Sequence, residues 1–238
     1  MNAISPDLPP AEQLARDNPV RIPGESAEYR KARTALLAEE IELRRHIERV
    51  AQMRRALPPG AEVADSYRFV GEDGLETDLA GLFGPHDTLV TYSYMFGPQR
   101  ERPCPMCTSL LDAWDGNAGS AGRQISLAVV ARSPIERLRA WKAQRGWRDL
   151  RLYQDLDGAF SRAWFALLPG GEEVPAMNVF TRRDGDLRHF WSGEMTGQTA
   201  DPGQDPRGAP DPAPLWAILD MTPGGRPPTW YPGLDDRA

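Results

Sequence analysis

TLVTYSYMFGPQRERPCPMCTSLLDAW, residues 88–114, contains both cysteines of this 238-residue chain. An apolar, β-branched and aromatic run over 88–96 predicts a strand, and a helical pattern follows the second cysteine. A charged loop between them leads to the motif Cys104-Pro105-Met106-Cys107. A strand, a loop, two cysteines three residues apart and a helix, in this order, indicate a redox dithiol. The sequence therefore predicts that the two thiols take part in chemistry.

The spacing assigns a different role to each sulfur. If Cys104 caps the helix, Pro105 takes the first helical position, where its missing N–H is not needed. The free N–H groups and the dipole at the helix start favour a thiolate at Cys104, and Arg100 and Arg102 in the preceding loop should lower its pKa further. Cys107 lies one turn later on the same side, among apolar residues. We therefore expect Cys104 to attack and Cys107 to be the buried resolving thiol.

Other uses of two cysteines compete with this interpretation. A zinc site needs four ligands, but a second cysteine pair is absent and the three histidines are scattered along the sequence. Haem attachment requires a histidine after the second cysteine, where Thr108 stands. A structural disulfide would close too short a loop to stabilise the fold much. Two unreactive reduced thiols stay open as an alternative. No cofactor and no metal are predicted.

Composition excludes several classes of partner. The net charge is −6 and the sequence pI is near 5.2, so no general attraction to nucleic acid or to an anionic membrane is expected. No apolar run approaches a membrane span, and the N-terminal residues lack the basic and apolar pattern of a signal peptide. In a reducing compartment a lone cysteine pair is more often catalytic than structural. We therefore expect a cytoplasmic protein whose partners are protein or small-molecule thiols and disulfides.

The N-terminal part of the chain predicts an arm and a long helix. Residues 1–25 are polar and proline-rich, which is typical of a flexible arm. Residues 26–58 form the N-terminal amphipathic helix, with Ser26 as its cap. Apolar residues recur along it at every seventh position, at Leu36, Leu43, Val50 and Leu57. This stripe predicts a helix that lies on its own domain, and a homodimer formed through the same stripe stays open as the alternative.

Strands and helices alternate over residues 61–225. Strands are predicted over 67–70, 88–94, 125–130, 150–153, 177–181 and 187–191. Helices are predicted over 78–83, 133–145 and 215–221, and the helix after Cys107 is expected to break at Gly116, Gly119 and Gly122. Asp184-Gly185 predicts a two-residue hairpin turn. A proline-rich loop over 200–214 precedes the last helix, and residues 226–238 form a C-terminal tail.

Several motifs together carry a family resemblance. They are MFGP at 95–98, CPMC at 104–107, LDAW at 111–114, LAVVARSP at 127–134, RGW at 145–147 and LDMTP at 219–223. The combination resembles an uncharacterised bacterial thioredoxin-like family, whose members are labelled domains of unknown function or predicted dithiol-disulfide oxidoreductases. The resemblance implies an α/β, thioredoxin-like fold over 61–225, with a central mixed sheet flanked by helices and, here, a long N-terminal helical extension. Thiol–disulfide exchange is only presumed for this family, so the prediction of a thiol–disulfide oxidoreductase depends on the dithiol itself.

The same resemblance implies a substrate site around a proline. Thioredoxin-fold proteins place a cis-proline opposite the dithiol, just before the first strand of the hairpin. Pro175 stands at the matching position, so the Val174–Pro175 bond is expected to be cis and Pro175 to belong to the catalytic site. Val174, Pro105 and Met106 are then expected to contact the substrate.

The sequence also departs from thioredoxin. The strand before the dithiol lacks the buried aspartate that accepts a proton there, and Tyr92 or Tyr94, or Asp155 or Asp157, could take its place. His189 is expected to be a structural histidine. The peroxiredoxin signature Pro-x-x-x-Thr-x-x-Cys fits neither cysteine. A thiol peroxidase is therefore a minor alternative, next to a thioredoxin-fold binding module whose dithiol is vestigial.

Overall fold

The computed structural model describes residues 8–63, 66–193, 218–219 and 221–225. The chain divides into two units, Met1–Ala56 and Leu57–Ala238, which we describe one at a time. The predicted loop over 200–214 and the tail over 226–238 lie outside the described residues, as does most of the helix expected over 215–221. Among the described helices, none combines the length and the apolar character needed to cross a membrane.

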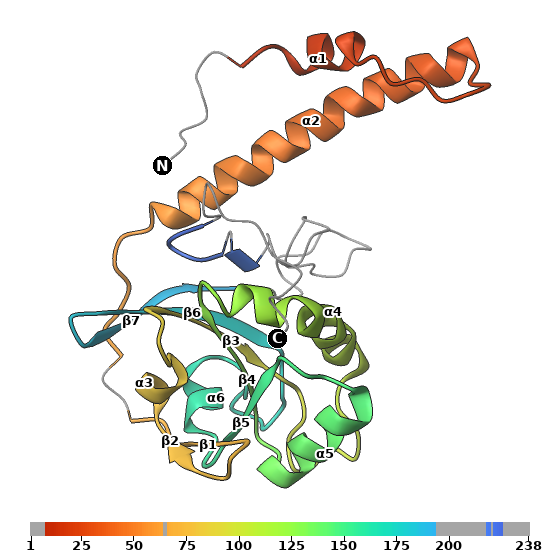
Figure 1. The fold of residues 1–238 in the computed structure, drawn as a ribbon. Coiled ribbons are helices and arrows are strands. Elements are labelled where there is room, and N and C mark those ends of the chain that lie inside the picture. Colours follow the sequence, from red (N-terminus) through yellow and green to blue (C-terminus); the bar gives the residue numbers. More distant parts are fainter. Residues whose placement is uncertain (1–7, 64–65, 194–217, 220, 226–238) are drawn as a thin grey trace. The chain divides into compact units, whose positions relative to one another are not determined.

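The described part of the N-terminal unit contains two helices, α1 (Ala11–Asp17) and α2 (Ala27–Arg55) (Figure 1). The long helix begins as expected, because the Ser26 hydroxyl oxygen accepts a hydrogen bond from the backbone N–H of Tyr29 at 3.1 Å. Helix α1 lies within the segment over residues 1–25 for which a flexible arm is expected, so residues 11–17 of that segment are helical. Ala11 and Ala15, four residues apart, pack with Ala38 of α2 in one small buried cluster. Because all three side chains are small, the two helices can approach closely. The polar composition of residues 1–25 gives no indication of this packing.

The seven-residue stripe of α2 stays open to solvent within this unit. Leu36 and Leu43 are 53% and 51% exposed, whereas Ala38 between them is buried against α1. The face that α1 covers is therefore different from the face that carries the stripe. The homodimer expected through the stripe stays a prediction.

The second unit is built on a seven-stranded sheet with the strand order β2-β1-β5-β4-β3-β6-β7. The strands are β1 (Phe69–Gly71), β2 (Glu76–Thr77), β3 (Thr88–Ser93), β4 (Ser126–Ala131), β5 (Arg151–Asp155), β6 (Ala176–Arg183) and β7 (Asp186–Ser192). Strands β3, β4 and β5 run parallel, and β1 and β6 are antiparallel to the strands beside them. The sheet is mixed, as the sequence predicts.

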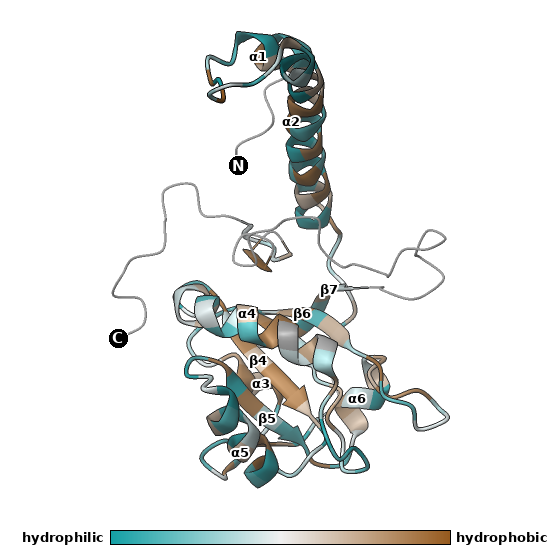
Figure 2. Cartoon of the chain, turned by 90° about the vertical axis from the view of Figure 1, so that its right-hand side faces the viewer, coloured by the Kyte–Doolittle hydropathy of each residue, from teal (hydrophilic) through white to brown (hydrophobic). Residues whose placement is uncertain are grey.

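Helices cover both faces of this sheet. They are α3 (Leu79–Leu82), α4 (Pro105–Ala121), α5 (Ile135–Arg145) and α6 (Ala159–Ala163). Helices α4 and α5 pack on one face, and α3 and α6 pack on the other (Figure 1). Strand β4 is buried along its whole length, with Val129 in the first hydrophobic cluster and Val130 in the second. Figure 2 shows the same strand in hydrophobic colour between the helices, so its continuous apolar run reflects burial on both faces.

The connections are those of a thioredoxin-like fold. Strand β3 leads to α4, then β4 and α5 follow, and the chain returns as an antiparallel β6–β7 hairpin whose first strand pairs with β3. The resemblance-based prediction of the fold is therefore confirmed. The hairpin turn is also confirmed, because Asp184 and Gly185 both have positive φ angles, 54° and 91°.

One prediction about α4 is wrong. The helix does not break at Gly116 or Gly119, and it ends only before Gly122. Its last turns are fixed by packing, since Ala118 and Ala121 are 5% and 0% exposed in the core. Burial of this face outweighs the helix-weakening effect of two glycines, which is about 1 kcal/mol each.

The segment that enters the second unit adds to the edge of the sheet. The Val63 N–H donates to the Leu187 carbonyl at 2.8 Å, and the His189 N–H donates to the Ala61 carbonyl at 3.0 Å. Residues 61–63 therefore lie along the outer edge of β7 like a short additional strand.

Candidate functional site

The two cysteines lie where β3 passes through a loop into α4. Cys104 is the N-cap of α4, with φ −61° and ψ 124°, and Pro105 takes the first helical position as predicted. The Cys104 N–H donates to the Met95 carbonyl at 3.1 Å, and its own carbonyl accepts the Thr108 N–H at 3.0 Å. Two hydrogen bonds therefore fix the backbone of Cys104, one through its N–H and one through its carbonyl.

The two sulfurs have different surroundings. Both are free thiols, and Cys104 is partly exposed whereas Cys107 is 2% exposed. Burial raises the pKa of Cys107 to about 11, and the neighbouring Cys104 adds to this rise. The polar groups of Tyr92 and of the Met95 backbone act in the opposite direction and lower this pKa. The expected contrast between an accessible and a sheltered thiol is confirmed.

Aromatic side chains form the floor beneath the cysteines. The rings of Tyr92 and Trp114 meet edge to face at 5.5 Å between centroids. The Tyr94 hydroxyl donates to the Thr108 hydroxyl oxygen at 2.6 Å, and Thr108 in turn donates to the Cys104 carbonyl at 2.9 Å. Burial raises the pKa of Tyr94 to about 12, so it is neutral at physiological pH. Tyr92 therefore packs in the same buried cluster as Cys107, and Tyr94 is linked through Thr108 to the backbone of Cys104.

A buried carboxylate lies beside the loop before Cys104. Glu173 is 5% exposed and accepts hydrogen bonds from the Gly97 N–H at 3.1 Å and from Arg100 Nε at 2.8 Å. A second cation, Arg132, lies 3.4 Å from its other oxygen. The sequence analysis missed Glu173, because its partners lie far away in the chain and no local pattern marks it.

Arg137 fixes the rest of the same loop from α5. Its guanidinium lies 4.2 Å from the centroid of the Phe96 ring, donates to the Glu101 carbonyl at 2.5 Å and also donates to the Arg100 carbonyl. The charge of Arg100 is directed at Glu173, and Arg102 is exposed. The role expected for these two loop arginines at Cys104 therefore stays a prediction.

The expectation of a cis-proline is wrong, because the Val174–Pro175 peptide bond is trans. The Val174 N–H donates to the Ala166 carbonyl at 3.1 Å, so it is not free to pair with a substrate strand. This short ladder continues directly into β6, where Ala176 pairs with Ser93 of β3. An extended chain with a trans peptide bond makes both the Val174–Ala166 hydrogen bond and the Ala176–Ser93 pairing. The substrate contacts expected at Val174, Pro105 and Met106, and the catalytic role expected at Pro175, stay predictions.

The remaining candidates lie elsewhere. Asp155 accepts hydrogen bonds from the Ser161 N–H and hydroxyl, at 2.9 and 2.7 Å, on the sheet face opposite Cys107. Asp157 accepts the Ala159 N–H at the start of α6. His189 stacks on Trp164 with centroids 5.1 Å apart, as expected of a structural histidine. Of the alternatives weighed for the missing aspartate, Tyr92 and Tyr94 share one buried cluster with Cys107.

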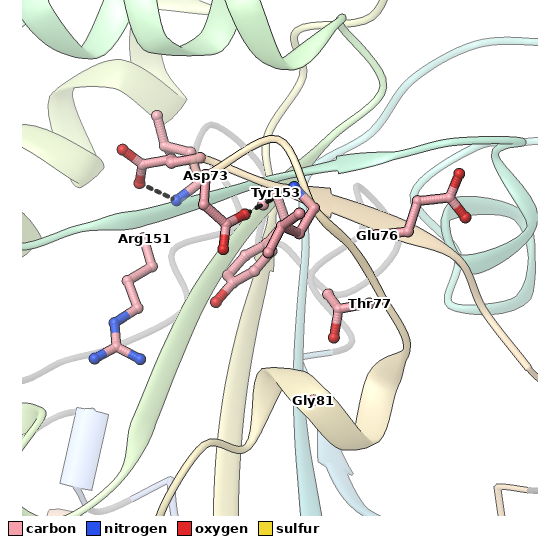
Figure 3. A pocket seen from close by; sticks show the side chains of 10 residues that line it. Asp73, Glu76, Thr77, Gly81, Arg151 and Tyr153 are labelled. Carbon is pink, nitrogen blue, oxygen red and sulfur yellow. Dashed lines mark hydrogen bonds between the residues drawn. The ribbon is translucent and has the colours of Figure 1, made fainter.

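A pocket of about 430 Å³ has neither cysteine in its lining. Its walls come from the β1–β2 hairpin, α3 and the start of β5, and Figure 3 shows Asp73, Glu76, Arg151 and Tyr153 around it. Neither the loop before Cys104 nor α4 contributes a residue to these walls.

Within the described ranges, no three His, Cys, Asp or Glu side chains gather as metal ligands would.

Comparisons with known proteins give one extended match. A family model described as bacterial protein of unknown function (DUF899) matches residues 19–236. No curated protein has a matching sequence.

Solved structures of thioredoxin-related proteins resemble part of the chain. The exposed lipoprotein thioredoxin Etrx1 from Streptococcus pneumoniae is 16% identical, with 52% of this chain and 85% of that chain covered and a TM-score of 0.38. A peroxiredoxin-like protein from Aquifex aeolicus is 13% identical over 57% of this chain and 75% of its own, with a TM-score of 0.44. At these low scores the fold assignment rests on the strand order and connections of the chain itself.

Proposed function

Because this chain belongs to the DUF899 family of bacterial proteins of unknown function, its activity has to be inferred from its own residues, and we propose that it is a thiol–disulfide oxidoreductase. The observation that carries the proposal is the contrast between the two thiols at the start of α4. Cys104 is partly exposed at the N-cap, and Cys107 is 2% exposed one turn later. An accessible attacking thiol beside a sheltered resolving thiol is what disulfide exchange requires.

The reaction has two exchange steps. The Cys104 thiolate attacks one sulfur of a substrate disulfide, which forms a mixed disulfide and releases the other substrate sulfur as a thiolate. Cys107 then loses its proton and attacks the Cys104 sulfur. The Cys104–Cys107 disulfide forms, the second substrate thiolate leaves, and the proton from Cys107 ends on a released thiol. The substrate gains two electrons and the protein dithiol loses them, so the reverse reaction oxidises a substrate dithiol.

The surroundings of the site support this chemistry. Pro105 starts the helix, so the N–H groups of its first turn are free to stabilise negative charge near Cys104. Glu173, Arg100 and Arg137 fix the loop that precedes the attacking residue. A thiol on a rigid loop keeps one orientation toward an incoming disulfide, which favours attack.

The test is a measurement of the midpoint potential together with reduction of insulin disulfides. We expect a reversible intramolecular disulfide, seen by mass spectrometry as the loss of two hydrogen atoms without dimer formation. Cys104→Ser should abolish insulin reduction, and its matched partner Cys107→Ser should accumulate mixed disulfides instead. A chain that forms no disulfide in any glutathione buffer would instead be a binding module with a vestigial dithiol. Consumption of peroxide that depends on Cys104 would favour the thiol peroxidase.

A further inference from the structure

Positive charge gathers around the loop that leads into Cys104. The loop, residues 97–103, and the side chains bonded to it contain four arginines and two glutamates, an excess of two positive charges, whereas the whole chain has a net charge of −6. The arginines are Arg100 and Arg102 in the loop, Arg132 directly after β4 and Arg137 on α5. The glutamates are Glu101 in the loop and Glu173 beside it.

The negative member of this cluster is buried and its positive members reach solvent. The Glu173 side chain is 4% exposed, whereas those of Arg100 and Arg132 are 33% and 22% exposed. One carboxylate is shared between two guanidinium groups, at 2.8 and 3.4 Å, so one positive charge is left over. The exposed carboxylates of Glu136 and Glu172 are close in the sequence but belong neither to the loop nor to its hydrogen-bond partners.

Arg137 adds a charge that no carboxylate pairs with among the described residues. Its guanidinium donates to the carbonyls of Gly97 and Glu101, at 3.4 and 2.5 Å, and to the Ser133 hydroxyl oxygen at 3.3 Å. All of these acceptors are neutral. Arg102 and Glu101 are exposed neighbours and offset each other in part. The loop and its partners therefore present a net positive charge to solvent.

This charge lies close to the accessible thiol. The Cys104 N–H donates to the Met95 carbonyl at 3.1 Å, so the loop begins and ends at the attacking residue. Arg102 is two residues before Cys104, which limits the distance between their Cα atoms to about 7 Å. Charges interact over about 10 Å at 0.1 M salt. A charged substrate at Cys104 is therefore within range of these arginines.

We propose that the substrate of Cys104 is an acidic disulfide, one that carries carboxylates close to its sulfurs, and that Arg102 and Arg100 determine this specificity. The inference rests on the proposed function and deepens it. Arginine suits this role because its planar guanidinium can donate two parallel hydrogen bonds to one carboxylate. The positive field also steers anions to the site. The arginines bind carboxylates and take no part in forming or breaking S–S bonds, so the two exchange steps are unchanged.

The experiment compares three small disulfides of similar size on the reduced full chain. They are 3,3′-dithiodipropionate with two carboxylates, bis(2-hydroxyethyl) disulfide with two hydroxyls and cystamine with two ammonium groups. Oxidation is followed by acid quenching, alkylation and mass spectrometry, and each rate is divided by the rate of 2-mercaptoethanol with the same disulfide. We expect the normalised rates to fall in the order given. The differences should shrink between about 20 mM and about 500 mM salt.

Variants of Arg102 test whether the charge acts locally. Arg102→Gln should lower the ratio of the dithiodipropionate rate to the cystamine rate about threefold, and Arg102→Glu about tenfold. Both substrates react with the same thiol, so a change in the reactivity of Cys104 cancels in this ratio. Arg183→Glu is the matched control, because it changes the net charge equally. Arg183 is exposed at the end of β6, and Ala176 at the opposite end pairs with Ser93 near the site. This control should leave the ratio unchanged.

The outcomes separate this inference from the proposed function. If none of the three disulfides oxidises the dithiol, both are overturned. If all three react at equal normalised rates, or if Arg183→Glu changes the ratio as much as Arg102→Glu does, only the specificity is overturned. The same comparison with a glutamate-flanked and a lysine-flanked peptide disulfide identifies the source of the acidic disulfide. A larger charge ratio for the peptides indicates a peptide substrate, and a larger ratio for the small disulfides indicates a small molecule.

Discussion

The two cysteines differ in what a small reagent can reach and in how readily each one ionises. The sequence predicted this difference because Pro105 marks the helix start and apolar residues share the face of Cys107. It could not predict Glu173 or Arg137, because their contacts with the loop before Cys104 join distant parts of the chain. Local sequence patterns indicate helix starts and buried faces. Ion pairs between residues far apart in the sequence can be identified only from the three-dimensional structure.

At the residue scale we predict selective alkylation of the reduced protein. Iodoacetamide should label Cys104 first, measured by mass spectrometry on Cys104→Ser and Cys107→Ser. Cys107 should react at least about a hundredfold more slowly than a free cysteine at neutral pH, because its pKa is about 11. Its labelling should accelerate as the pH rises toward that value, and both thiols should react alike in denaturant. Equal rates in the folded variants would contradict the assignment of roles.

At the element scale, α4 shows where local propensity fails. Its glycines indicate an early end, but packing of its small residues extends the helix to Ala121. Asp115 on the same helix has a role that its sequence neighbours do not suggest. One of its carboxylate oxygens accepts the N–H groups of Arg148, Asp149 and Leu150, at 2.9, 2.9 and 3.1 Å. Asp115 thereby ties the α5–β5 loop to α4.

This tie predicts a stability loss in Asp115→Ala. Removing the carboxylate leaves three backbone donors without their acceptor, which should lower the free energy of unfolding by about 2–3 kcal/mol. Asp115→Asn keeps an acceptor oxygen at the same place and should lose clearly less. Urea unfolding monitored by tryptophan fluorescence measures both variants. If the alanine and asparagine variants are equally stable, the hydrogen bonds to this loop contribute little.

At the scale of the whole molecule, the succession of elements along the chain was predictable. The sequence predicted, in this succession, the strands that correspond to β3, β4, β6 and β7 and the helices that correspond to α4 and α5. It did not predict the complete order of the strands in the sheet. The sequence did not reveal helix α1, and the cis bond predicted between Val174 and Pro175 is trans. Both depend on contacts that residue types do not reveal: small alanines between two helices, and a ladder between Ala166 and Val174.

The strand-like segment over residues 61–63 has a consequence for solubility. Without it, the outer N–H and C=O groups of β7 would form an open template for another chain, and such edges drive aggregation. A truncated protein that starts at Leu57 keeps this cover and should remain monodisperse in light scattering. One that starts at Ser66 has lost it and should form larger assemblies over time that bind thioflavin T. If the two truncated proteins aggregate to the same extent, β7 does not need residues 61–63 to prevent aggregation.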